Sequence, residues 1–191
     1  MYNHTISALC AVILAMVQST YALAQNSSDF RSMTIPSEAC EIFGSELSGS
    51  ARSGRTGNAI YVCADPGSTG AVTAMCPIPL SNIRASGTGS PKLAKFRTYF
   101  MDSDGPGSEA RVYSTIEKKY IIGLSVPVDL VCGPFDSNLV ANVSSFPTSA
   151  TKNCSTVQTI LARTFYRSSV HLSVAPTTSS RCAQFYGIDF P

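Results

Sequence analysis

Acidic side chains gather in one short stretch of the sequence, MDSDGPGSEA at residues 101–110. Asp102, Asp104 and Glu109 stand there among glycines and a proline, and carboxylate oxygens are ligands that calcium prefers. A helix–loop–helix calcium loop has a third acidic or amide side chain before its glycine, but Gly105 follows Asp104 directly. The stretch therefore predicts a tight turn between two strands, and a calcium site formed by Asp102, Asp104 and Glu109 is the alternative.

Catalytic chemistry finds little support in the residues. His171 is the one histidine beyond residue 24, so any nucleophile activated by an imidazole would depend on it. It lies in SVHLSV, an alternating segment typical of a strand, and no G-x-S-x-G motif occurs. A carboxylate-dependent glycosidase needs two facing acids, and the 12 Asp and Glu residues leave that alternative open. We expect no catalytic residue and no cofactor other than calcium.

The first 24 residues have the layout of a secretory signal peptide. An apolar run at residues 8–17 is followed by a polar stretch and by the small-residue pattern Ala22-Leu23-Ala24. The run is shorter than the roughly 20 residues that a membrane-spanning helix needs. We therefore expect cleavage after Ala24, secretion to the extracellular space and no membrane span.

Six cysteines follow the cleavage site, and an even number in an exported chain indicates three disulfides. A thiolate metal site would bring C-x-x-C pairs or neighbouring histidines, and the sequence has neither. Spacing alone allows 15 pairings, so the connectivity stays open at this point. The six are Cys40, Cys63, Cys76, Cys132, Cys154 and Cys182.

Charge and composition define a class of protein but no partner. The net charge of +2 is small, and no basic run is interleaved with aromatic residues as a groove for nucleic acid requires. Low charge content, many small polar residues and the absence of tryptophan favour a β-rich exported domain.

Short segments rich in β-branched and aromatic residues follow one another from Ala59 onward and predict antiparallel strands. In KFRTYFM, alternation places Phe96 and Phe100 on one face, which we expect in the core. Arg97 and Tyr99 fall on the other face, where Tyr99 is a candidate for a surface contact.

Two segments carry helix signals. Residues 35–44, IPSEACEIFG, predict a short helical turn that holds Cys40. Residues 157–166, VQTILARTFY, fit helical spacing and strand alternation about equally, so both interpretations stay open.

Three motifs occur in order in the middle of the chain. The first is Tyr-Val-Cys at residues 61–63, the second Asp-Leu-Val at residues 129–131, and the third NVSSFPTSATKNC at residues 142–154. Together they resemble the small secreted guanyl-specific ribonucleases of fungi and the fungal effectors built on that fold. The resemblance implies a small helix packed on an antiparallel sheet and a disulfide between Cys63 and Cys154.

The same resemblance implies that the enzymatic chemistry is lost. The family works by general acid and base catalysis with a histidine and a glutamate, and an arginine holds the phosphate. Here Leu130 stands at the arginine position and Phe146 at the position of the loop histidine. Without an imidazole or a guanidinium at these places, catalysis by that route should be largely lost.

The resulting prediction is one α+β domain, a small helix on an antiparallel sheet, ribonuclease-like and braced by three disulfides, with an all-β sandwich as the alternative. Residues 1–24 are expected to be the signal peptide, 25–58 an amino-terminal lead and loop, and 59–154 the ribonuclease-like core. Residues 155–191 are expected as a carboxy-terminal extension packed on that core.

The predicted function is that of a secreted, non-catalytic ribonuclease-like effector that binds a host protein or RNA. We expect loops near residues 64–70, 84–92 and 102–109 to make the contacts. One alternative is a small exported hydrolase, either a nuclease or a carboxylate-dependent glycosidase. The other is a calcium-stabilised binding module, whose melting temperature would rise when calcium is added.

Overall fold

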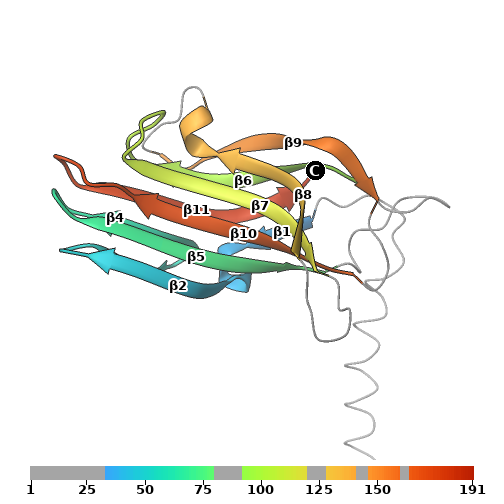
Figure 1. Ribbon diagram of the computed structural model, residues 1–191, viewed down its shortest axis with the longest axis horizontal. Coiled ribbons are helices and arrows are strands. Elements are labelled where there is room, and N and C mark those ends of the chain that lie inside the picture. Colours follow the sequence, from blue (N-terminus) through green and yellow to red (C-terminus); the bar gives the residue numbers. More distant parts are fainter. Residues whose placement is uncertain (1–32, 80–91, 120–127, 141–145, 160–163) are drawn as a thin grey trace, which may run out of the picture. The chain divides into compact units, whose positions relative to one another are not determined.

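The computed structural model describes residues 33–79, 92–119, 128–140, 146–159 and 164–191, which form two antiparallel sheets (Figure 1). Sheet A holds β1 (Met33–Pro36), β3 (Arg52–Thr56), β4 (Ala59–Ala64), β6 (Lys92–Asp102), β9 (Thr148–Thr159) and β11 (Arg181–Phe190). Sheet B holds β2 (Glu41–Ser48), β5 (Thr69–Ile78), β7 (Ala110–Lys119), β8 (Val128–Asp136) and β10 (Phe165–Val174).

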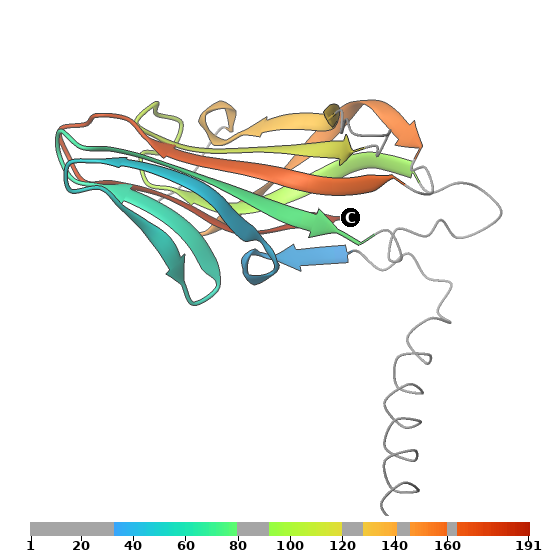
Figure 2. The same cartoon turned by 60° about the horizontal axis from the view of Figure 1, so that its bottom comes forward.

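The strand orders place sequence-distant segments side by side. Sheet A runs β3-β4-β11-β6-β9, and sheet B runs β2-β5-β10-β7-β8. β1 pairs with the last residues of β11, so the first described strand lies beside the carboxy-terminal end of the chain (Figure 2). The last two strands of the chain therefore lie at the centres of the sheets, β11 in sheet A and β10 in sheet B.

The two sheets pack face to face around one core, as strand alternation requires. The inward side chains of β6 include Phe96 and Phe100, both fully buried, which confirms the prediction from KFRTYFM. Phe100 of sheet A meets Phe135 of sheet B with ring centres 5.1 Å apart. The hydroxyls of Thr98 and Ser114 also meet across the sheets at 2.9 Å. The described part of the chain is thus a β-sandwich.

The predicted α+β fold is wrong, and the all-β alternative is confirmed. Within the described residues, the helical elements are the three-residue 3-10 turns η2 (Ser37–Ala39) and η4 (Ser137–Leu139). The helix signal after Pro36 produces only η2, because Cys40 already has extended backbone angles and β2 then pairs with β5. None of the described turns has the length and apolar character of a membrane-spanning helix.

Strands also come from the segments that were expected to be a lead and an extension. Residues 25–58, expected as lead and loop, supply β1, β2 and β3 from Met33 onward. Residues 155–191 supply β10 and β11, each bonded to a strand on both sides within its sheet. Of the ambiguous residues 157–166, those that the structure describes at 157–159 and 165–166 are strand. The signal peptide lies outside the described residues.

Three disulfides brace the sandwich, and their pairing corrects the one implied by the ribonuclease resemblance. Cys63 bonds Cys182 rather than Cys154. The two are register partners on β4 and β11 with Cα atoms 4.1 Å apart. Cys154 lies on β9, which β11 and β6 separate from β4, and it bonds Cys132 of β8, so this disulfide joins the two sheets.

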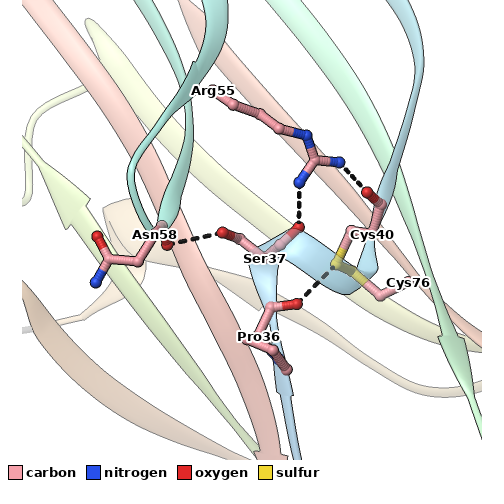
Figure 3. Close-up of a disulfide and its surroundings, with 6 residues drawn as sticks. All are labelled: Pro36, Ser37, Cys40, Arg55, Asn58 and Cys76. Carbon is pink, nitrogen blue, oxygen red and sulfur yellow. Dashed lines mark hydrogen bonds between the residues drawn. A yellow bond between two sulfur atoms is a disulfide. The ribbon is translucent and has the colours of Figure 1, made fainter.

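The third disulfide joins Cys40, directly after η2, to Cys76 of β5 (Figure 3). Arg55 of β3 reaches over this turn and donates to the carbonyl oxygens of Ser37, at 2.7 Å, and of Cys40. Ser37 in turn donates from its hydroxyl to the carbonyl of Asn58 at 2.7 Å. These bonds tie η2 and Cys40 to β3 and to Asn58, which precedes β4.

Candidate functional site

The outer face of sheet B carries a polar surface that strand alternation builds. Val170 of β10 is fully buried, so its odd-numbered neighbours on the strand point outward. Register places Thr73 of β5 and Tyr113 of β7 on either side of His171, and Asp136 of β8 beside Tyr113. We call this surface the β10 face; its members are Ala71, Thr73, Arg111, Tyr113, Glu117, Asp136, Arg167, Ser169, His171 and Ser173.

Two arginines of the β10 face are held by carboxylates. Arg111 donates from Nε to Oδ1 of Asp136 at 3.0 Å and from Nη2 to Oδ2 at 2.5 Å. Its guanidinium also lies 4.9 Å from the centre of the Tyr113 ring. The hydrogen bonds to Asp136 raise the pKa of Arg111 above its ordinary value, against the opposing effect of burial. Arg167 donates from Nε to Glu117 at 2.8 Å. Both pairs fix planar polar groups without adding net charge.

His171 and Thr73 form the polar centre of the face. Nδ1 of His171 and Oγ1 of Thr73 lie 3.2 Å apart, within hydrogen-bonding distance. Ser169 and Ser173 are the next outward residues of β10 on either side of His171. The ring of Tyr113 therefore lies beside a row of short hydroxyl side chains and the imidazole of His171.

One end of the β10 face deepens into a hollow of about 630 Å³. Arg111 and Ser173 of the face line it, together with Glu46 of β2, Asn138 of η4 and Ser108 of the loop between β6 and β7. A volume of this order lies within the usual range for small-molecule sites. The β10 face thus joins a flat polar strip to a concave end.

Two of the predicted calcium residues, Asp104 and Glu109, belong to the loop that carries Ser108. Asp104 accepts the backbone N–H groups of Glu109 and Ala110 at 2.8 and 2.9 Å. Glu109 accepts from Nε of Arg181 at 2.6 Å. The Asp104 carboxylate therefore binds backbone groups within and directly after its own loop, and the Glu109 carboxylate binds Arg181 of β11.

Asp102 is completely buried at the end of β6. One carboxylate oxygen accepts from the hydroxyl of Ser137 at 2.5 Å, and the other has no hydrogen-bond partner. Burial, followed by the interaction with the neighbouring Asp104 carboxyl, raises the pKa of Asp102 to about 7, while the Ser137 bond acts in the opposite direction. Burial also acts to raise the pKa of Asp104, but its hydrogen bonds with Asp102 and with the backbone outweigh burial and lower it.

Calcium binding at these residues stays a prediction. In the described part of the chain, no three His, Cys, Asp or Glu side chains are grouped so that they could hold a metal ion. Asp102, Asp104 and Glu109 instead contact Ser137, backbone N–H groups and Arg181. A melting temperature that rises with added calcium, and a rise that Asp104→Ala abolishes, would establish the site.

The loops predicted to bind a partner meet in part at the hollow. Thr69 and Gly70, from the loop expected at residues 64–70, and Ser108, from the loop expected at 102–109, line it. The third loop, at residues 84–92, falls outside the described residues except at its last position.

The residues at the centre of the β10 face were not predicted. Tyr113, Arg111 and His171 lie in ARVYST and SVHLSV, whose alternation was recognised as strand but not as a shared surface. Tyr99, predicted as a surface contact, lies on the opposite sheet and donates its hydroxyl to Asp189 at 2.9 Å.

Comparison with known proteins gave matches at the level of structure. No protein-family model and no curated protein matches the chain. Among solved structures, a family 11 carbohydrate-binding module from Clostridium thermocellum, in complex with a β-1,3-1,4-mixed-linked tetrasaccharide, is 13% identical, with coverage of 87% of this chain and 92% of that chain and a TM-score of 0.36. A family 29 carbohydrate-binding module in complex with mannohexaose is 14% identical, with coverage of 82% and 89% and a TM-score of 0.34.

A xylan-binding domain from Paenibacillus barcinonensis is 8% identical, with coverage of 83% of this chain and 92% of that chain and a TM-score of 0.36. At scores this far below 0.5, the likeness carries no argument about this chain, and the β10 face has to be interpreted from its own residues.

The interpretation as a ribonuclease-like effector is wrong. The described residues form a two-sheet sandwich instead of a helix packed on a single sheet, and Cys63 does not bond Cys154. The calcium-stabilised binding module, one of the alternatives, does not depend on the ribonuclease fold.

Proposed function

We propose that this chain is a non-catalytic binding module that takes an uncharged glycan on the β10 face. The observation that carries the proposal is the row across sheet B in which Tyr113 stands between His171 and Asp136, with Arg111 stacked on its ring. This row combines one aromatic surface with several oriented hydrogen-bonding groups.

A sugar ring has chemistry that matches such a row. Its C–H faces pack against aromatic rings, and its hydroxyls donate to carboxylates and accept from guanidinium groups. Arg111 has five N–H donors and uses two of them on Asp136, so donors remain for a ligand. Because Asp136 also holds the guanidinium in place, little side-chain entropy is lost on binding.

The balance of charge on the face argues against a nucleic acid. Arg111 is paired with Asp136 and Arg167 with Glu117, so neither is an uncompensated cation for a phosphate. A hollow rimmed by Glu46 would further repel an anionic chain. A protein partner would call for a larger apolar centre than Tyr113 alone supplies in this row.

The described carboxylates give no support to the glycosidase alternative. Acid catalysis needs a protonated carboxyl in contact with substrate, and Asp102, whose pKa is raised to about 7, is completely buried. The three disulfides fit an oxidising compartment. We therefore place the module outside the cell, where it would bind glycan without cleaving it.

The test measures retention of the secreted form by immobilised mannan, mixed-linked β-glucan and xylan, followed by calorimetry with the glycan that is retained. Tyr113→Ala should weaken binding by about tenfold or more, because it removes the aromatic surface. Tyr61→Ala is the matched control, since Tyr61 points outward from β4 on the opposite sheet. Circular dichroism establishes that both variants fold.

Failure to bind any of the three polysaccharides would reject the proposal. Equal losses for Tyr113→Ala and Tyr61→Ala would reject the β10 face as the site.

A further inference from the structure

The end of sheet B away from the hollow exposes large apolar side chains. Phe165 of β10 is 63% exposed, Leu130 of β8 is 59% exposed and Val128 is 44% exposed. Phe165 of β10 pairs with Lys119 of β7, which in turn pairs with Val128 of β8. Leu130 lies two residues further along β8. These residues lie on the same side of the sheet as the β10 face, because Phe165 and His171 are both odd-numbered residues of β10.

A continuous strip connects this apolar end to the Tyr113 row. The row of His171 lies six positions along β10 from the row of Phe165, which at about 3.3 Å per residue is about 20 Å. Between them lie Ser169, whose side chain is short, and the Arg167–Glu117 pair. Aromatic surface, paired polar groups and aromatic surface thus succeed one another along the neighbouring strands β7 and β10.

We propose that the β10 face and this apolar end form one track for an extended glycan of several hexose units that lies along β10. The inference rests on the proposed function, and it names the length and direction of the ligand. Tyr113 supports one end of the chain and Phe165 the other, and the Arg167–Glu117 pair provides hydrogen bonds between them.

An uncharged polymer fits the track better than a second protein does. The apolar side chains are interleaved with Lys119 and with the Arg167–Glu117 pair, so they form no contiguous apolar core of the kind that protein interfaces bury. Sugar rings alternate apolar faces with hydroxyl edges, and the track alternates in the same way. A ligand that spans about 20 Å contacts both aromatic ends at once, which a disaccharide is too short to do.

The test is calorimetry with manno-, gluco- and xylo-oligosaccharides from disaccharide to hexasaccharide. The affinity for the preferred series should rise by at least about tenfold between the shortest and the longest ligand, because each added ring gains contacts. Phe165→Ala should flatten that rise, whereas Tyr113→Ala should weaken every length. Tyr61→Ala should leave the series unchanged.

The two proposals fail in distinguishable ways. Binding that does not strengthen with length, or a Phe165→Ala variant that keeps the full length dependence, would overturn the track while the glycan site stands. No binding at any length would overturn both. Sedimentation that reveals a dimer of the native chain, dissolved by Phe165→Ala, would overturn the track by assigning the apolar end to self-association.

Discussion

The hydroxyl of Ser137 donates to the carboxylate of Asp102 at 2.5 Å inside the sandwich, and it also accepts the backbone N–H of Val112 at 2.8 Å. Ser137 thereby ties η4 to β6 and β7. Because Asn138 of η4 lines the hollow, a buried acid supports one wall of the candidate site.

This buried acid predicts that stability falls as pH rises from about 3.8 to about 7. The pKa of Asp102 is raised, mainly by burial, from an ordinary value of 3.8 to about 7. Between these values the folded chain holds a proton that the unfolded chain has released, so the free energy of unfolding decreases with increasing pH. The lowered pKa of Asp104 acts only below the ordinary value, outside this window. Urea unfolding at intervals across the window measures the slope.

Asp102→Asn should remove most of this pH dependence and exceed the native chain in stability at about pH 8, because an amide carries no charge to bury. Asp129→Asn is the matched control, since that carboxyl is 54% exposed. A slope unchanged in Asp102→Asn would show that the pH dependence arises elsewhere.

The hydroxyl pair of Thr98 and Ser114 predicts strong coupling between two substitutions. Thr98→Val alone leaves the buried Ser114 hydroxyl without its partner at 2.9 Å, which should cost about 1–3 kcal/mol. Adding Ser114→Ala removes the orphaned group and should recover part of that loss. Denaturant unfolding of both single variants and of the double variant measures the coupling energy. Strict additivity would contradict the pairing.

The disulfides predict unequal losses of stability when they are removed. Cys63–Cys182 closes a separation of 119 residues and Cys132–Cys154 one of 22 residues. Loop-closure entropy assigns about 5 kcal/mol to the first and about 3 kcal/mol to the second. Paired Cys→Ala variants, compared by denaturant unfolding, should show this order. The reverse order would indicate that the link between the two sheets matters more than chain entropy.

Sequence alone predicted local geometry well and long-range pairing poorly. The alternation in KFRTYFM correctly placed Phe96 and Phe100 in the core, because strand period depends on neighbours in the chain. The partner of Cys63 was assigned wrongly, because strand order decides that Cys182 lies opposite and no local pattern encodes strand order. Pro36 gave a valid helix start that β2 pairing ends after one turn.

The candidate site was missed for the same reason. His171 and Thr73 are 98 positions apart in the chain and 3.2 Å apart in space. The alternation of side chains along a strand predicts which residues of β10 share a face. Only the strand order β5-β10-β7 in sheet B brings Tyr113 and Arg111 beside them. An outward tyrosine two residues after an arginine in ARVYST was the one local signal for this surface.

The paired charges of the β10 face predict binding that is nearly independent of salt. An uncharged ligand forms no ion pair with the face, and the Arg111–Asp136 contact, at 2.5 Å, and the Arg167–Glu117 contact, at 2.8 Å, are close enough to be little screened. Dissociation constants for a neutral oligosaccharide should therefore change by less than about twofold between about 50 and about 500 mM sodium chloride. Heparin serves as a polyanionic comparison, and any weak binding to it should decline steeply with salt. A steep decline for the neutral ligand would mean that charge, and not the Tyr113 ring with its hydrogen-bonding neighbours, drives recognition.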